Sequence, residues 1–351
     1  NQNNHAFDTH RDPGSSIKPI VAYGPAIDMG LMGSASRLSN YPTKYSDGTQ
    51  IMHDTSAGTQ EMMTLQDALD TSWNVPAYWT YQTILKSGKS VKPYMSKMNY
   101  GIKDYSIESL PLGGGIEPTV VQHTNGYQAL LNGGKYEPYY VVDSIKDDTG
   151  KEIYKHESQP VQVYSKATSS IMAELLKGPI KSQKTTTFYG QLSGLNPALA
   201  SADWVGKTGT SNNFSDVWLM VGTPAVTLSS WVGHDDNTPM AAMTGYLNNS
   251  QYVAQLANAI YQANPDVFGI NQKFAMDPSV TKSTVLVSTG EKPGTITGGG
   301  FKNVAVSGAT TTSNWATPDG APSTQYKFAI GGSDSDYADA WSKILGGVKK
   351  K

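Results

Sequence analysis

The sequence predicts an α+β protein in which an antiparallel sheet is flanked by helices and followed by a small β-rich C-terminal domain. Three observations predict this architecture. Apolar residues recur at helical spacing near the N-terminus, between residues 17 and 27. Three strand-like stretches with short turns follow one another between residues 203 and 232. After residue 277, strand-like stretches alternate with glycine-rich turns, so we place the two domains at residues 1–275 and 276–351.

Length and composition narrow the class of protein. At 351 residues the chain is long for one compact domain and suits a large domain with a smaller one. Hydrophobic residues make up 38% and charged residues 16% of the chain, which suits a rather polar, soluble globular protein. The formal charge of −2, without a basic stripe, argues against a surface for nucleic acid or anionic membrane. The absence of cysteine excludes thiolate catalysis and disulfides.

Neither a metal ion nor another cofactor is expected. The six histidines are scattered, and none forms a His-x-x-x-His pair. No apolar run reaches the roughly 18 residues of a membrane span, and no signal peptide opens the chain. Residues 1–5 are polar and loop-like, so we expect a soluble fragment of a longer polypeptide.

The first candidate for chemistry is Ser15-x-x-Lys18. Pro19 suits the first turn of a helix, which places Ser15 at a helix N-terminus, where free N–H groups favour negative charge. Lys18 lies one turn further on and can reach the Ser15 hydroxyl. A lysine desolvated in a cleft can be neutral enough to take the serine proton. The pattern alone is weak, because it recurs at Ser279 and Lys282 in a strand-rich stretch.

The next elements in the chain are helical. Pro25 is expected to kink or split the first helix, and Gly30 to end it. A polar excursion over residues 33–60 follows. Residues 62–69 then predict a short helix that Thr64 caps, with an aspartate three residues further on. Another helix begins near residue 76.

Ser72-Trp73-Asn74 lies at the corner between these two helices. A hydroxyl and an amide two residues apart can relay a proton and hold a substrate amide, and we take Trp73 between them as a substrate contact. The alternative is a capping serine and a turn asparagine. The same spacing recurs at Ser211 and Asn213.

The middle of the chain is predicted to form structural elements of the scaffold. A helix is predicted from Thr119 to residue 132, and another over residues 165–176. Between them, residues 139–145 and 152–154 predict a hairpin.

The third candidate is Lys207-Thr208-Gly209, on the first strand of the predicted meander. A cation beside hydroxyls, with a glycine that lets a ligand backbone approach, suits an extended peptide and its carboxylate. The backbone N–H groups of Thr210 and Ser15 are the expected oxyanion hole. The tripeptide occurs once in the chain.

Ser-x-x-Lys, Ser-x-Asn and Lys-Thr-Gly, in this order, form the signature of penicillin-binding proteins and class A β-lactamases. The sequence resembles the transpeptidase domain of class A, bifunctional penicillin-binding proteins, and among them most the type 1b enzymes of streptococci. The small C-terminal domain resembles that of the type 1b enzymes in particular. The likeness covers most of the chain and includes residues 11–19, 113–117, 132–134, 206–210, 216–218 and 231–236.

The resemblance implies a reaction at Ser15. The serine would attack the penultimate D-alanine carbonyl of a peptidoglycan stem peptide, release the last D-alanine, and pass the acyl group to an amine of a neighbouring stem. β-Lactams would acylate Ser15 as mimics of the D-Ala-D-Ala end. Lys18 would act as base toward Ser15, although which residue is the base in this family is disputed. Ser72 and Asn74 would shuttle the proton and position the donor amide. The residues that would hold the donor carboxylate and assist the leaving group are Lys207, Thr208 and Thr210.

The sequence departs from the family in what precedes the nucleophile. The family has sheet strands before this point, and only fourteen residues precede Ser15, so we expect those strands to be missing from this chain or supplied separately. We likewise expect the family's glycosyltransferase domain and membrane anchor to lie outside this chain. A polymerase role and a location at the outer face of the bacterial cytoplasmic membrane would therefore belong to the parent protein.

Three alternatives remain open. A class A β-lactamase needs a glutamate in a Glu-x-x-Leu-Asn setting, and Glu108 lies in the right region but lacks the asparagine. A D,D-carboxypeptidase would hydrolyse the acyl-enzyme instead of transferring it. A penicillin-sensing module would form a stable adduct without turnover.

The C-terminal stretch carries no predicted catalytic residue. Strands are expected over residues 284–287, 294–297, 304–306 and 326–330, and a helix over residues 336–345. Packing support is the simplest role for this domain. A docking surface for cell-wall synthesis or division proteins is the alternative.

Overall fold

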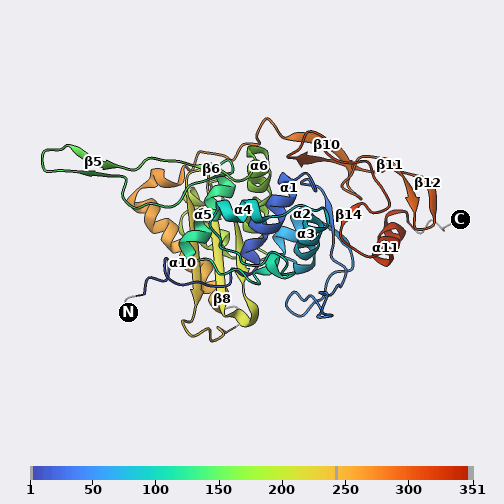
Figure 1. The fold of residues 1–351 in the computed structure, drawn as a ribbon, viewed down its shortest axis with the longest axis horizontal. Helices are drawn as coiled ribbons and strands as arrows, with labels where there is room; N and C mark the ends of the chain where they lie inside the picture. Colours follow the sequence, from blue (N-terminus) through green and yellow to red (C-terminus); the bar gives the residue numbers. More distant parts are fainter. Residues whose placement is uncertain (1–2, 242–243, 347–351) are drawn as a thin grey trace.

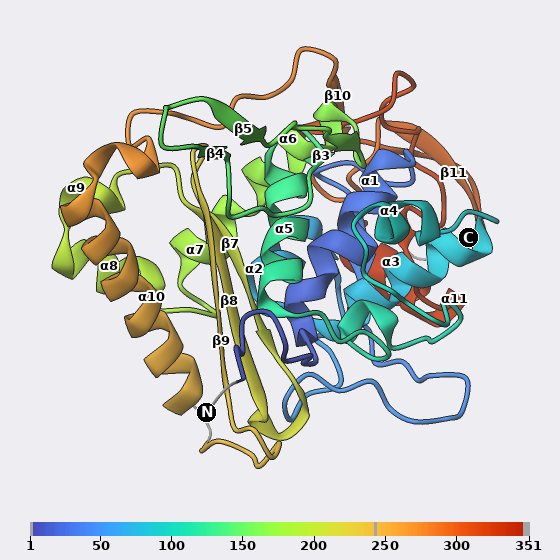
Figure 2. The same cartoon turned by 60° about the vertical axis from the view of Figure 1, so that its left-hand side comes forward.

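The main sheet of the protein lies between two layers of helices (Figures 1 and 2). The structure is a computed structural model that describes residues 3–241 and 244–346. Strands β7 (Val205–Thr210), β8 (Asp216–Gly222) and β9 (Thr227–Gly233) form an antiparallel sheet in the order β7-β8-β9. The predicted α+β fold class is confirmed, and so is the predicted meander.

Both faces of this sheet are covered. Helix α10 (Thr244–Ala263) packs on one face and α5 (Val120–Leu131) on the other (Figure 2). Strand β8 is buried along its whole length, and its nearly continuous apolar sequence suits a strand covered on both sides. Among the residues that the structure describes, β9 pairs only with β8. The expectation of further strands before the nucleophile stays a prediction.

The segment that follows Ser15 is helical but changes type twice. It runs as the 3₁₀ helix η1 (Gly14–Ile17), the π-helix η2 (Pro19–Tyr23) and α1 (Gly24–Asp28). The change from η2 to α1 falls one residue before Pro25, which lacks the N–H that a continuing helix would use. The predicted interruption at this proline is therefore confirmed, as a change of helix type. Apolar side chains along the segment are fully buried and form the centre of the largest hydrophobic core.

The two helices that flank the second motif differ from the prediction at their first residues. The helix expected from residue 62 begins later, as α2 (Leu65–Asp70), because Met62–Thr64 forms strand β2 against β1 (Arg37–Ser39). The predicted cap is confirmed, since Thr64 Oγ1 accepts a hydrogen bond of 2.9 Å from the N–H of Asp67. The following helix, α3 (Asn74–Lys86), begins two residues before the expected start.

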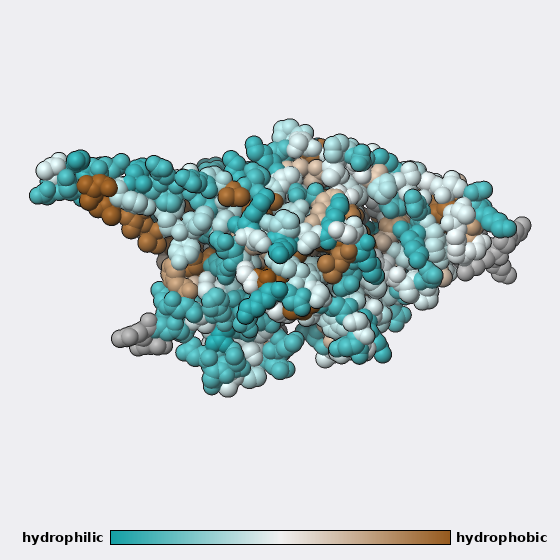
Figure 3. Space-filling model, in the orientation of Figure 1, coloured by the Kyte–Doolittle hydropathy of each residue, from teal (hydrophilic) through white to brown (hydrophobic). Residues whose placement is uncertain are grey.

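The predicted scaffold elements are present. Thr119 caps α5 and Ser165 caps α6 (Lys166–Leu175). The hairpin is shorter than predicted, with β4 (Ser144–Lys146) against β5 (Glu152–Lys155), and it projects from the body of the protein (Figure 1). Figure 3 shows apolar side chains along this projection.

The C-terminal region forms two small antiparallel pairs and a helix. Strand β10 (Thr281–Leu286) pairs with β13 (Thr310–Trp315), and β11 (Gly294–Gly298) pairs with β12 (Phe301–Val306). The helix α11 (Asp334–Ile344) opens with a capping box.

The prediction of a strand over residues 326–330 is wrong in its length. Only β14 (Ala329–Ile330) forms, and it pairs with β1 in the N-terminal part of the chain. The preceding aromatic residues pack instead around Trp341, whose indole N–H donates to the Tyr326 carbonyl over 2.8 Å. Aromatic residues favour strands in sequence, but here their side chains serve a helix-packed core.

The remaining elements were not predicted. They are α4 (Lys92–Lys97), η3 (Leu110–Leu112), β3 (Lys135–Tyr136), β6 (Val161–Gln162), α7 (Lys177–Ser182), α8 (Phe188–Leu195), α9 (Pro197–Ala200), η4 (Asn212–Phe214) and η5 (Pro265–Phe268). None of the helices in the described ranges has the length and apolarity that a membrane crossing requires.

Candidate active site

Ser15 lies on a tight turn that packs directly against β7. Ser15 lies at the start of a helical segment, as predicted, and the first turn of this segment is the 3₁₀ helix η1. A Cβ on Gly14, whose φ is +49°, would lie 2.4 Å from the Thr210 carbonyl oxygen, and one on Gly209 would lie 2.1 Å from the Pro13 carbonyl oxygen. Only glycine allows this approach of backbone to backbone. We expected Gly209 to make room for a ligand, but in the structure it makes room for the nucleophile turn.

Several hydrogen bonds fix the start of this turn. Asp12 Oδ1 accepts from the N–H of Gly14 over 2.7 Å, and the Asp12 carbonyl accepts from the Trp218 indole over 2.8 Å. Arg11 Nη2 donates to the carbonyls of residues 234 and 235, both over 3.0 Å. Segments that carry the family likeness therefore hold the nucleophile turn in place.

Lys18 is completely buried and contacts the second motif. Its Nζ donates to the Ser72 carbonyl (2.5 Å), Asn74 Oδ1 (2.7 Å) and the Trp73 carbonyl (3.2 Å), and it lies 3.4 Å from Ser72 Oγ. The direct hydrogen bond to the Ser15 hydroxyl that we expected does not occur in the described part of the chain. Burial, and next the charge of Lys207, hold the pKa of Lys18 well below its usual range. A lysine with a lowered pKa gives up its proton more readily than an exposed lysine, which is what a proton-transfer role at this position requires.

Lys207 approaches the same serine from β7. Its Nζ donates to Ser72 Oγ over 2.6 Å and to the Thr208 carbonyl over 3.1 Å. Burial lowers the pKa of Lys207 to about 7, although the Asp70 carboxylate acts in the opposite direction. Two buried ammonium groups beside one hydroxyl repel each other, so Lys18, whose pKa the charge of Lys207 lowers further, is the lysine that gives up its proton more readily.

The second motif lies at the corner between α2 and α3, as predicted. Ser72 has a φ of +60°, a left-handed conformation that is uncommon outside glycine and typical of strained functional positions. Asn74 is the first residue of α3, and its Nδ2 donates to the Met52 carbonyl over 2.7 Å. The Trp73 ring packs against His53, with centroids 4.6 Å apart, and its predicted contact with substrate stays a prediction.

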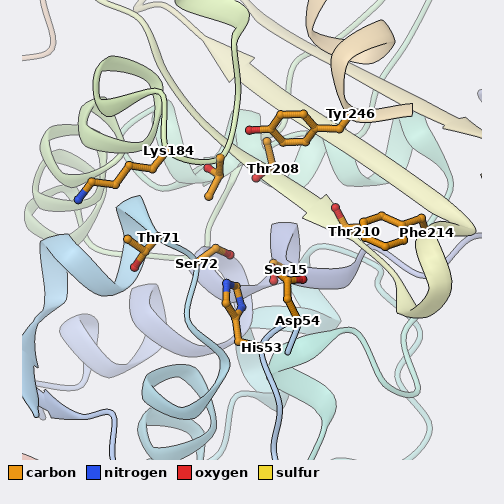
Figure 4. A pocket seen from close by; sticks show the side chains of 11 residues that line it. Ser15, His53, Asp54, Thr71, Ser72, Lys184, Thr208, Thr210, Phe214 and Tyr246 are labelled. Atoms are coloured by element: carbon orange, nitrogen blue, oxygen red, sulfur yellow. The ribbon is translucent and has the colours of Figure 1, made fainter. Parts of the chain in front are cut away.

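The three motifs surround one cavity of about 320 Å³ (Figure 4). Ser15, Ser72, Thr208 and Thr210 line it from the nucleophile turn, the helix corner and β7. A second cavity of about 700 Å³ extends past Asn74. The lining residues of the first cavity that we did not predict are His53, Asp54, Thr71, Lys184, Thr185, Phe214 and Tyr246.

His53 is the most notable of these additions. Its ring points into the cavity toward Ser72 and Ser15 (Figure 4). Burial, together with the charges of Lys18 and Lys207, lowers the pKa of His53 to about 4, so the imidazole is neutral near pH 7. The only sequence signal is a lone histidine in a polar segment, which has no periodicity or motif to single it out.

The competing features of the sequence lie elsewhere. Ser279, in the second Ser-x-x-Lys, is exposed, and its hydroxyl donates to Asp277 Oδ1 over 2.5 Å in a surface turn. Glu108 accepts from the N–H and the hydroxyl of Ser46, over 2.8 and 2.7 Å. The glutamate considered for a β-lactamase is thus tied to a surface loop.

Comparison with known proteins identifies the family of the chain. The family model described as "Penicillin binding protein transpeptidase domain" matches residues 1–265, so the chain belongs to this family. The chain is 31% identical over 231 residues to penicillin-binding protein 1F of Bacillus subtilis (strain 168), an alignment that covers 64% of this chain and 30% of that protein. This confirms the predicted relationship to class A penicillin-binding proteins. The particular likeness to the streptococcal type 1b enzymes stays a prediction.

Solved structures show the same fold. The 2.6 Å crystal structure of penicillin-binding protein 1A from Haemophilus influenzae superposes with a TM-score of 0.68 at 18% identity, over 92% of this chain and 50% of that chain. An imipenem acyl-enzyme complex of penicillin-binding protein A from M. tuberculosis superposes with a TM-score of 0.55 at 16% identity, over 72% of this chain and 62% of that chain. The chain spans about a third of the length of the curated relatives it matches.

Proposed function

We propose that this protein is a D,D-transpeptidase that cross-links peptidoglycan stem peptides through an acyl-enzyme at Ser15. The observation that carries the proposal is the Ser72 hydroxyl, which lies 2.6 Å from Lys207 Nζ and 3.4 Å from Lys18 Nζ beside the cavity that Ser15 lines. A hydroxyl between two buried lysines with lowered pKa values is suited to moving a proton to and from a serine nucleophile.

In the proposed reaction, Ser15 is first acylated by the donor peptide and then deacylated by an amine. Ser15 Oγ attacks the penultimate D-alanine carbonyl while its proton passes to Lys18 Nζ. The tetrahedral intermediate expels the terminal D-alanine, whose nitrogen takes a proton through the Ser72 hydroxyl. An acceptor amine then attacks the ester carbonyl and gives a proton to Lys18 Nζ, and Ser15 Oγ leaves and takes that proton back. The products are a new amide bond and the free enzyme.

Other residues predicted from the sequence have supporting roles in this proposal. Lys207 and Thr208 bind the carboxylate of the donor, and Asn74 positions its amide. The N–H groups of Ser15 and Thr210 stabilise the oxyanion, and the close packing of Gly14 on Thr210 supports this pairing because it brings the two segments together.

The wider role is proposed for the parent protein. The class A relationship supports a glycosyltransferase activity elsewhere in the polypeptide and a location at the outer face of the cytoplasmic membrane. We also propose that the domain boundary lies near residue 275. A separate hydrophobic cluster around Trp341 supports a distinct C-terminal unit, although β14 ties it to β1. We propose that this unit supports the main domain by packing against it, with docking of cell-wall synthesis or division proteins as the second candidate role.

The test is intact mass spectrometry after incubation with benzylpenicillin. We expect one penicilloyl adduct on the wild-type chain and none on Ser15→Ala. Ser279→Ala is the matched control, because it removes the serine of the second Ser-x-x-Lys, and it should acylate normally. An adduct that persists on Ser15→Ala would refute the proposal.

A second assay separates the three activities that share this acylation. A stem-peptide donor is supplied with and without an amine acceptor, and the products are resolved by chromatography. A transpeptidase makes the cross-linked product, a carboxypeptidase only releases D-alanine, and a sensor does neither.

A further inference from the structure

A chain of buried polar groups lies directly behind the nucleophile turn. His123 on α5 is completely buried between Ser16 and Tyr100. Its Nε2 lies 2.8 Å from Ser16 Oγ, and its Nδ1 lies 2.8 Å from the Tyr100 hydroxyl. The rings of Tyr100, Tyr127 and Trp218 stand edge-on around the imidazole, with centroids 5.3 to 6.0 Å away. Neither the motifs nor the proposed reaction uses this histidine.

The hydrogen-bond partners of His123 determine which tautomer of its neutral imidazole is present. The Ser16 hydroxyl donates its only hydrogen to the Pro13 carbonyl over 2.6 Å, so it can only accept from His123. The hydrogen of His123 is therefore on Nε2, and Nδ1 accepts from the Tyr100 hydroxyl. Burial lowers the pKa of His123 to about 3 and raises that of Tyr100 well above its usual value, in agreement with a neutral ring and a phenol that keeps its proton.

Two side chains of α5 hydrogen-bond to Ser16, the residue that follows the nucleophile. His123 donates to its hydroxyl, and Tyr127, one turn further along the helix, donates to its carbonyl over 2.6 Å. On the opposite side, a Cβ on Gly209 would lie 2.8 Å from Ser16 Oγ, so β7 leaves the serine no room to move away. A fully satisfied buried network of this kind specifies one arrangement of the segments it joins.

We propose that His123, as the neutral Nε2–H form, is a positioning residue that fixes Ser16 and thereby aims the Ser15 hydroxyl into the cavity. It acts through Ser16 and does not touch substrate. The effect on activity rests on the proposed function of Ser15. A displacement of about 1 Å at a reacting atom can cost about 100-fold in rate, so the second-order rate of acylation should be sensitive to this contact.

The variants are His123→Leu, which removes both hydrogen bonds, and His123→Gln, which can retain a donor and an acceptor. His156→Leu, on the projecting hairpin, is the matched control. We expect benzylpenicillin to acylate folded His123→Leu about 10- to 100-fold more slowly than the wild type, with partial rescue in His123→Gln and no change in the control. Folded His123→Leu that acylates within twofold of the wild type would overturn the proposal.

A measurement on the wild-type chain does not depend on activity or on the stability of a variant. ¹⁵N NMR of the histidine rings should show His123 protonated on Nε2 and unprotonated on Nδ1 from pH 5 to pH 8. The opposite tautomer, or a ring that titrates in this range, would overturn the proposal even if His123→Leu failed to fold. A wild-type chain that forms no adduct at Ser15 would instead refute the proposed function and leave the tautomer result standing.

Discussion

Lys207 should make the folded protein less stable at neutral pH, and its lowered pKa gives the size of the loss in the free energy of unfolding. The folded pKa of Lys207 is lowered from 10.5 to about 7. Between these values the unfolded chain binds a proton that the folded chain does not, so the free energy of unfolding rises as pH increases from 7 to 10.5. This linkage lowers the stability by ~4 kcal/mol at pH 7 and by only ~1 kcal/mol at pH 10.

Lys207→Met removes the titrating group while keeping a long apolar side chain in the same space. The variant loses the hydrogen bonds to Ser72 Oγ and the Thr208 carbonyl, which together are worth ~2 kcal/mol. We therefore expect Lys207→Met to be more stable than the wild type by ~2 kcal/mol at pH 7 and slightly less stable at pH 10. Acylation by benzylpenicillin should be lost at the same time.

The assay is urea unfolding of both proteins at pH 7 and pH 10. Lys282→Met is the control, because it removes the exposed lysine of the second Ser-x-x-Lys, and it should change stability little at either pH. If Lys207→Met were destabilised equally at both pH values, Lys207 would keep its charge in the folded protein throughout this range. The assignment of Lys207 and Lys18 as a pair with lowered pKa values would then be wrong.

Three further variants test separate contacts. Gly209→Ala should fold poorly or lose acylation, because its Cβ would lie 2.1 Å from the Pro13 carbonyl oxygen, and thermal unfolding together with adduct formation measures both effects. Asn74→Ala should slow acylation at least tenfold because it removes an acceptor of Lys18 and the tie to Met52, and stopped-flow acylation rates measure this. Burial raises the pKa of Asp12 from 3.8 to about 6, so between pH 4 and pH 6 the folded chain binds a proton that the unfolded chain does not. The wild type therefore loses stability as the pH rises from 4 to 6, and Asp12→Asn should remove this loss. Unfolding curves across that range that match the wild type would contradict this last expectation.

Local patterns predicted the elements whose sequence signals are self-contained. The predicted cap at Thr64 depends only on a side chain and an N–H three residues away, as do the caps that Thr119 and Ser165 form at the start of two predicted helices. The buried strand β8 was found because it is apolar along its length. In contrast, β13 begins Thr-Thr-Thr and is largely polar, and it forms because β10 offers a partner 29 residues earlier in the chain.

The residues of the site also fall into those that the sequence predicts and those that it does not. The three motifs identify groups whose chemistry is visible in the residue type, such as Ser15 and Lys207. His53 and His123 could not be found, because each acquires its surroundings from segments distant in sequence: Trp73 for one, and Ser16 with Tyr100 for the other. Distances between elements also decided the partner of Lys18. Helical spacing places it one turn from Ser15, yet its Nζ lies among the oxygens of the second motif.

That placement of Lys18 bears on how a proton leaves and returns to Ser15. Because Lys207 donates to Ser72 Oγ, the hydroxyl hydrogen of Ser72 remains available for another acceptor. The nitrogen of a departing amine in the cavity is one such acceptor, while Lys18 Nζ donates to Ser72 Oγ from 3.4 Å away. A proton taken up by Lys18 can therefore reach the leaving group through Ser72 without crossing bulk water. We expect Ser72→Ala to slow release of the leaving amine from a peptide donor more than it slows opening of a β-lactam, whose amine stays attached to the acyl group and can collect its proton later.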